Sequence, residues 1–291
     1  MTTYPLAQVE KLTGIKAHTL RIWERRYHFL TPDRTETNIR YYSDAQLRKL
    51  LNISILTRNG YRISKVDRMQ DQEIFKLVAN LLNSTDKKIE DDIQGLTLSM
   101  IEMNEEKFNA IFRASIIRKG LTNTIIELIY PFLQHIGILW ITEKTHPAQE
   151  HFITNLIRQK IISAVETLAP PIENSKSIVL FLPENENHEL ALLLTSYIAR
   201  DLGWKVYYLG QNVPREDIHK VTEIVSPNAI MTILTTPRRD TKELLKQLRM
   251  ENPDIPLLIS GNVQSFREWE MDDLLVQIKS PKDFIDYIEG I

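Results

Sequence analysis

The last third of the chain alternates short apolar runs with amphipathic segments, and this alternation constrains the fold more than any other feature. The apolar runs are SIVLFL (177–182), KVYYLG (205–210), AIMTIL (229–234) and PLLISG (256–261), with LVQI (275–278) as a candidate fifth. Helical patterns at 187–202, 214–225, 240–251 and 280–289 separate these runs. Strands that alternate with helices pair in parallel. We therefore expect a Rossmann-like, doubly wound parallel sheet over residues 176–291.

A histidine stands where such a sheet binds ligands. In doubly wound sheets, ligands lie outside the carboxyl ends of the strands. His188 follows the first predicted strand, in the stretch FLPENENHELALLL (181–194). It is either an ordinary residue at a helix start or a metal ligand, since imidazole binds transition metals well.

The middle of the chain, residues 71–169, has the pattern of helices throughout. Four stretches carry apolar residues at three- and four-residue spacing, at 87–103, 105–120, 121–143 and 147–169. This pattern predicts a four-helix bundle. Pro131 lies inside the third stretch and is expected to kink it. PPIENSK at 170–176 is expected to be a linker.

The first 70 residues have the pattern of a helix-turn-helix. The apolar positions of LAQVEKL (6–12) predict a short helix that Thr13-Gly14 ends, and AHTLRIWERRYHF (17–29) predicts a second helix. A polar, turn-rich stretch follows. Ser43 and Gln46 then have the spacing of a capping box at the start of another helix.

Charge is divided unevenly along the chain. Residues 1–70 hold 13 Lys and Arg against 6 Asp and Glu, whereas the rest of the chain holds 23 against 32. A basic head on an acidic body indicates a polyanionic partner at one end. The alternative is a solvated face in which the arginines pair with Glu24 and Glu36. Two acidic partners are too few for thirteen basic residues, so a nucleic-acid partner is favoured.

The head resembles the DNA-binding domain of the MerR family of winged helix-turn-helix regulators. LTGIKAHTLRIWERRYHF (12–29) and RTETNIRYYS (34–43) are similar to the recognition helix and wing of that family, in the same order. The resemblance implies a homodimer that binds a palindromic operator in double-stranded DNA. It implies DNA contacts from Lys16, His18, Thr19, Arg21, Arg25, Arg34, Arg40 and Tyr41, with Tyr42 as an alternative to Tyr41.

The rest of the chain resembles the cobalamin-binding module of light-responsive carotenoid-gene repressors of the CarH and LitR type, a module also present in methionine synthase. Its Asp-x-His-x-x-Gly, Ser-x-Leu and Gly-Gly motifs are matched by ENHELA (186–191), TIL (232–234) and GN (261–262), with 40 and 26 residues between them. The repressors also carry Trp, nine residues, then Glu-His. Trp140 and Glu150-His151 have this spacing.

This second resemblance implies an adenosylcobalamin site. His188 corresponds to the lower axial ligand of cobalt, and Glu186 stands where the family has the aspartate that holds the other imidazole nitrogen. Trp140 would cover the upper face of the cofactor, with Glu150 and His151 near the upper ligand. The other implied contacts with the cofactor come from Thr232, Leu234 and Gly261.

The sequence departs from that module at the residues that line the slot for the nucleotide tail. Ala191, Thr232 and Asn262 replace the family's Gly, Ser and second Gly, and the amide of Asn262 would intrude where backbone must approach closely. Ile141 also stands where some light-sensing relatives carry histidine.

Two functions remain open. One is a repressor that adenosylcobalamin and light control through oligomerisation, with a tetramer built from dimers. The other is a regulator whose module has lost the cofactor and serves oligomerisation or binds a regulatory protein.

Other classes of protein are disfavoured. A cobalamin-dependent enzyme needs a catalytic barrel of about 250 residues, for which the chain has no room, so we expect no enzymatic activity. No apolar run is long enough to cross a bilayer. The chain has no cysteine, and its first residues lack the pattern of a secretory signal, so we expect a cytoplasmic protein.

Overall fold

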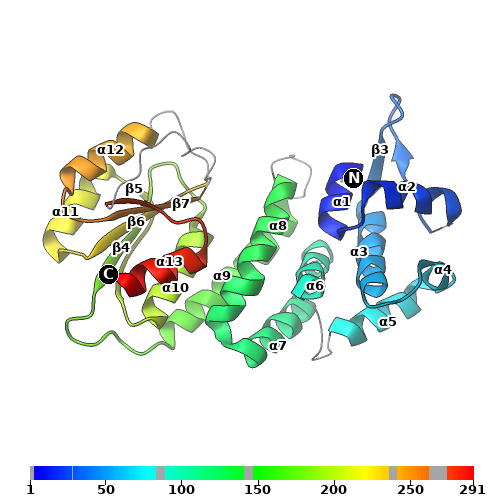
Figure 1. Ribbon diagram of the computed structural model, residues 1–291, viewed down its shortest axis with the longest axis horizontal. Helices are drawn as coiled ribbons and strands as arrows, with labels where there is room; N and C mark the ends of the chain where they lie inside the picture. The colour runs from blue at the N-terminus through cyan, green and yellow to red at the C-terminus, as the bar shows by residue number, and fades with distance from the viewer. Residues whose placement is uncertain (1–2, 28, 83–88, 141–146, 236–240, 262–273) are drawn as a thin grey trace. The chain divides into compact units, whose positions relative to one another are not determined.

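The structure is a computed structural model that describes residues 3–27, 29–82, 89–140, 147–235, 241–261 and 274–291 (Figure 1). The chain forms two compact units, Met1–Leu156 and Ile157–Ile291. The first is helical with a small antiparallel sheet, and the second is built on a parallel sheet. The mixed α and α/β class predicted from the sequence is therefore confirmed. Among the described residues, no helix is long and apolar enough to span a membrane.

The head has the predicted helix-turn-helix followed by a short antiparallel sheet. Its elements are β1 (Thr3–Pro5), α1 (Leu6–Thr13), α2 (Ala17–Arg26), β2 (Asp33–Arg34), β3 (Arg40–Ser43) and α3 (Asp44–Arg58). The strand order is β1-β3-β2. Gly14, with φ at 71°, ends α1 in the left-handed region, and its N–H donates to the Glu10 carbonyl. The second helix ends at Arg26 rather than continuing to residue 29, because the backbone of Tyr27 is extended.

The start of α3 is the predicted capping box. The Ser43 hydroxyl accepts from the Gln46 N–H at 3.3 Å, and the Gln46 side chain accepts from the Ser43 N–H at 2.9 Å. Two short helices follow α3, namely α4 (Ile63–Val66) and α5 (Asp71–Leu82).

The four predicted helical stretches of the middle segment are present as α6 (Ile89–Ile101), α7 (Glu105–Thr124), a π-helical turn η1 (Ile125–Ile129) with α8 (Tyr130–Trp140), and α9 (Pro147–Glu166). Helix α6 is central, because it is buried along most of its length and packs against α3, α7 and α8. Gly95 allows this packing, since a Cβ there would lie 2.6 Å from the Ile111 Cδ1.

The kink expected at Pro131 stays a prediction, and the backbone departs from α-helical geometry at two places before it. The backbone leaves helical geometry at Gly120, with φ at 77° and ψ at 169°. The turn just before Pro131 is widened to a π-helix. Proline has no N–H for the carbonyl four residues earlier, and a π turn is a common local response to such a lost hydrogen bond.

The second unit has the predicted parallel sheet, with all five strands present: β4 (Ser177–Pro183), β5 (Lys205–Val213), β6 (Ala229–Leu234), β7 (Leu257–Gly261) and β8 (Leu275–Gln277). The strand order is β5-β4-β6-β7-β8. Helices α10 (Glu189–Asp201) and α13 (Pro281–Gly290) cover one face, while α11 (Arg215–Val225) and α12 (Thr241–Glu251) cover the other (Figure 1). The order of the strands reverses at β4, so the switch point that binds ligands in such sheets lies at its carboxyl end.

Candidate functional site

Helix α2 has one buried and one polar face. Leu20 and Trp23 are buried in the head, whereas Arg21 and Arg25 are exposed because they lie on the opposite side of the helix. Lys16 and His18, at the start of the helix, are also exposed, and Thr19 is half-buried. The outward face therefore carries donors and positive charge, as a helix that enters the major groove requires.

Glu24 ties the two arginines of the wing to the recognition helix. Its two carboxylate oxygens accept from the Arg34 Nη2 and the Arg40 Nε, each at 2.6 Å. Partial burial acts to raise the pKa of Glu24, but the hydrogen bonds from Arg40 and Arg34 outweigh it and hold this pKa below its ordinary value. The pairing with Glu24 that the sequence left open thus exists for these two arginines. It orients them beside α2, because the carboxylate belongs to that helix.

The two neighbouring tyrosines of β3 have different environments. Tyr42 is fully buried, and burial, followed by the nearby Glu24 charge, raises the pKa of its hydroxyl. Its hydroxyl is enclosed in the head and cannot reach a phosphate group. Tyr41 is half-buried on the other side of the strand and stays the candidate for a DNA contact.

At the switch point of the parallel sheet, Glu186 holds His188. The Glu186 Oε1 lies 2.6 Å from the His188 Nδ1 and accepts from the His188 N–H at 3.0 Å. The Glu186 Oε2 accepts from the N–H of Thr235, just after β6, at 2.9 Å. Glu186 is buried while about half of the His188 side chain is exposed. The imidazole is therefore oriented through Nδ1, which makes Nε2 the nitrogen for a metal ion.

The ends of β6 and β7 form the edge beside this histidine. The Thr232 hydroxyl is buried and has no hydrogen-bond partner among the described residues. Gly261 has φ at 116°, and a Cβ there would lie 2.2 Å from the Leu234 carbonyl oxygen, so only glycine fits. The Leu234 side chain packs in the core, and it also lines a cavity of about 270 Å³ that Glu186 borders. Asn262 lies outside the described residues.

Glu189, which the sequence patterns did not single out, fixes the start of α10 next to His188. Its carboxylate pairs with the Arg158 Nη2 of α9 at 2.7 Å and accepts from the Tyr208 hydroxyl of β5 at 3.0 Å. Burial, followed by the charge of Glu189, raises the pKa of Tyr208. The sequence around Glu189 does not indicate these partners, because Arg158 and Tyr208 are distant from it along the chain.

The predicted upper part of the cofactor site belongs to the first unit. Glu150 and His151 lie near the start of α9, where the Glu150 Oε2 is 2.8 Å from the His151 Nδ1, and His151 is exposed. Trp140 is the last residue of α8, and its side chain lies outside the described part of the structure, as does Ile141. That these residues face His188 stays a prediction.

These features define a class of protein: a winged helix-turn-helix head joined to a helical segment and a parallel sheet with a histidine at its switch point. Comparison with protein families gives three matches. The MerR HTH regulatory-protein family matches residues 4–73, one B12-binding-domain family matches residues 176–279, and a second matches residues 92–163. The chain thus combines a MerR-type HTH domain with two domains that match B12-binding-domain families.

The chain is similar to several transcriptional regulators over different shares of its length. The HTH-type transcriptional repressor CarH of Myxococcus xanthus is 25% identical over 296 residues, which cover 99% of this chain and 98% of that protein. The repressor CarA of the same organism is 23% identical over 245 residues, covering 78% and 75%. The regulator MlrA of Escherichia coli strain K12 is 36% identical over 73 residues, covering 25% and 30%. The resemblances inferred from the sequence motifs are thus confirmed.

Proposed function

We propose that the protein is a repressor that binds a palindromic DNA operator as a homodimer or larger assembly, and that adenosylcobalamin and light control its DNA affinity. The observation that carries this proposal is the contact between Glu186 and His188 at the switch point of the sheet. A carboxylate on one imidazole nitrogen is the usual support of a metal-ligating histidine.

On the DNA side, the exposed residues of α2 act on the major groove. Arg21 and Arg25 donate to base edges or phosphates, and Lys16 lies where the helix start approaches the backbone. Arg34, Arg40 and Tyr41 donate to phosphates beside the wing. Since these contacts release counterions, binding weakens steeply with salt.

On the cofactor side, the described residues at the switch point of the sheet fit a cobalamin. His188 would hold the cobalt through Nε2. The Thr232 hydroxyl, which has no hydrogen-bond partner among the described residues, would donate to a polar group of the cofactor at the sheet edge. Gly261 keeps the backbone of β6 and β7 close at that edge. When bound, adenosylcobalamin supplies a cobalt–carbon bond that light can break. Trp140, Glu150 and His151 would cover the opposite face of the cofactor.

Control of DNA affinity then follows from assembly. A tetramer built from dimers brings several heads to adjacent sites, and the later contacts are effectively intramolecular, so binding is much tighter than for one dimer. The cofactor can favour the tetramer only to the extent that it binds the tetramer-competent conformation more tightly. The residues that touch the upper face of the cofactor supply that difference.

The experiment tests uptake and assembly together. Purified wild type and His188→Ala are mixed with adenosylcobalamin in the dark, desalted, and examined by visible spectroscopy and by size-exclusion chromatography before and after green light. We expect coloured wild type whose elution volume changes on illumination, and a weakened or altered spectrum for His188→Ala. A wild type that stays colourless and elutes identically in all conditions contradicts cofactor control. It would leave the module as an oligomerisation or partner-binding part of a DNA-binding regulator.

A further inference from the structure

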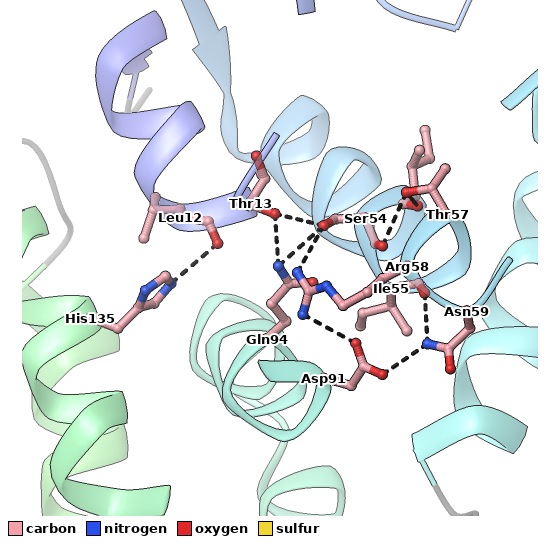
Figure 2. Close-up of polar contacts among 11 residues, drawn as sticks. Leu12, Thr13, Ser54, Ile55, Thr57, Arg58, Asn59, Asp91, Gln94 and His135 are labelled. Carbon is pink, nitrogen blue, oxygen red and sulfur yellow. Dashed lines mark hydrogen bonds and ion pairs between the residues drawn. The ribbon is translucent and has the colours of Figure 1, made fainter. Parts of the chain in front are cut away.

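Side chains from three other helices cap the carboxyl end of α1 (Figure 2). The Leu12 carbonyl lies 3.2 Å from the His135 Nε2 of α8. The Thr13 carbonyl accepts from the Ser54 hydroxyl of α3 at 2.6 Å and from the Gln94 Nε2 of α6 at 2.8 Å. The last carbonyls of a helix have no partner within that helix. Helices α3, α6 and α8 therefore satisfy the groups that α1 cannot satisfy itself.

A second contact attaches α6 to the head one turn earlier. The Ser54 Oγ links it to the first contact, because this oxygen accepts from the Gln94 Nε2 at 3.2 Å and from the Arg58 Nη2 at 3.3 Å. Asp91, one turn before Gln94, pairs with the Arg58 Nη1 at 3.2 Å and accepts from the Asn59 Nδ2 at 2.8 Å (Figure 2). Asp91 and Gln94 are only 2% and 4% exposed, so both contacts are shielded from water. Two attachments on one helix fix orientation as well as distance. A buried polar group that loses its partner also costs more than a solvated one, so the arrangement resists small displacements.

The capped carbonyls lie directly before the turn of the helix-turn-helix. Residues 14–16 join α1 to α2, and the Ile15 N–H donates to the Thr13 hydroxyl at 3.1 Å, which itself donates to the Val9 carbonyl at 2.7 Å. The turn is thus tied to Thr13. A displacement of Thr13 moves the start of α2, where Lys16 lies.

These contacts join the two functional halves of the sequence. Gln94 and His135 lie in the helical segment that matches a B12-binding-domain family, whereas Leu12 and Thr13 lie in the region that matches the MerR family. We propose that Gln94 and His135 form a joint through which the conformation of the helical segment sets the orientation of the recognition helix, with Gln94 as its main positioning residue. This inference rests on the DNA binding proposed above. Because coupling between sites is reciprocal, DNA bound to the head must in turn stabilise α6 and α8.

The chain offers a closely matched pair of variants. Gln94→Met removes the donor and keeps the length of the side chain, and the Gln94 Oε1 that is also lost has no partner among the described residues. Gln149 is the control. It is 9% exposed, its Nε2 donates to the Ile101 carbonyl at the end of α6 at 3.0 Å, and its Oε1 likewise has no described partner. Gln149→Met therefore deletes a bond from a buried amide to a backbone carbonyl within the helical segment, away from the head. Gln94→Met deletes such a bond to Thr13 together with the bond from the Gln94 Nε2 to the Ser54 Oγ.

The probe is a DNA duplex that the wild-type full-length protein selects from a random-sequence pool. Affinity is measured by fluorescence anisotropy, and hydrogen exchange is measured by mass spectrometry for peptides from α6 and α8, with and without the duplex. We expect DNA to slow exchange in both helices of the wild type. For Gln94→Met we expect affinity lower by a factor on the order of 5–10 and no DNA-dependent slowing in α6 or α8. Gln149→Met should behave as the wild type in both measurements.

The outcomes separate the two proposals. If Gln94→Met binds DNA and protects α6 and α8 as Gln149→Met does, the joint is refuted while DNA binding stands. If the wild type selects no duplex, the proposed function fails and the joint fails with it. Thermal melting verifies that each variant folds. Should Gln94→Met not fold, Ser54→Ala is the second variant. It removes the other donor to the Thr13 carbonyl and the oxygen that accepts from Gln94 and Arg58. We expect the same loss of protection, and its absence again overturns the joint.

Discussion

Substitution of Gly261 by alanine tests the close approach of β6 and β7 at the cofactor edge. The added Cβ would lie 2.2, 2.6 and 2.9 Å from the carbonyl oxygen, carbonyl carbon and nitrogen of Leu234. These are backbone atoms, so no rotamer change can relieve the contact. The two strand ends, which pair at Leu234 and Gly261, must separate.

The expected cost has two parts. Holding a residue other than glycine at φ of 116° costs about 1–3 kcal/mol, and forcing a methyl group into a packed site costs about 1–3 kcal/mol more. We therefore expect Gly261→Ala to lower the free energy of unfolding of the sheet unit by about 2–6 kcal/mol. Gly203→Ala is the control. Gly203 also has positive φ, at 83°, but nothing lies within 4 Å of its added Cβ, so only the backbone cost of about 1–2 kcal/mol applies.

The assay is hydrogen exchange of the most protected amides in β6 and β7, under conditions where exchange reports the free energy of opening. This measurement follows the sheet unit separately from the helical unit. We expect a loss for Gly261→Ala that exceeds the loss for Gly203→Ala by about 1–3 kcal/mol, the cost of the added methyl group. Equal losses for the two variants would refute the argument that backbone crowding at Leu234 requires glycine.

Three further predictions concern single side chains. Glu24→Gln should lower stability by about 1 kcal/mol; because the pKa of Glu24 is depressed below its ordinary 4.5 in the folded state, this difference is present above pH 4.5, and urea unfolding should show it vanish as pH falls further. Glu186→Gln should weaken cobalamin binding roughly 10–100-fold by spectral titration, since an amide cannot accept from both His188 and Thr235; an unchanged affinity contradicts this role. Burial lowers the pKa of His135 below 6.5, so its contribution to stability is present above that pH and is lost as pH falls; His135→Gln should flatten this acid-side slope in urea titrations, and an identical slope would count against it.

The sequence alone determines the local features of the chain, namely its strands, its helices and their caps. The parallel strands follow from short apolar runs separated by helical patterns, and the capping box of Ser43 and Gln46 follows from a spacing of three residues. Short-range sequence patterns determine the fold class, the helix-turn-helix and the position of His188 at a strand end. The reason is that strand and helix periodicities, and helix capping, involve residues within a few positions of one another.

The polar partners were decided only by tertiary structure. Glu24 holds Arg34 and Arg40 across 10 and 16 positions, Glu186 reaches Thr235 across 49, and Gln94 reaches Thr13 across 81. Sequence reasoning identified the arginines and His188 by type, but it could not assign Gln94 any role, because a buried glutamine in a helix has no periodic signature. Such contacts depend on which helix and strand ends lie close together in the fold. Those ends come together only when the apolar faces of the helices and strands have packed. The sequence therefore determined the elements and the chemistry available at their ends, while packing selected which of those groups join the head to the helical segment.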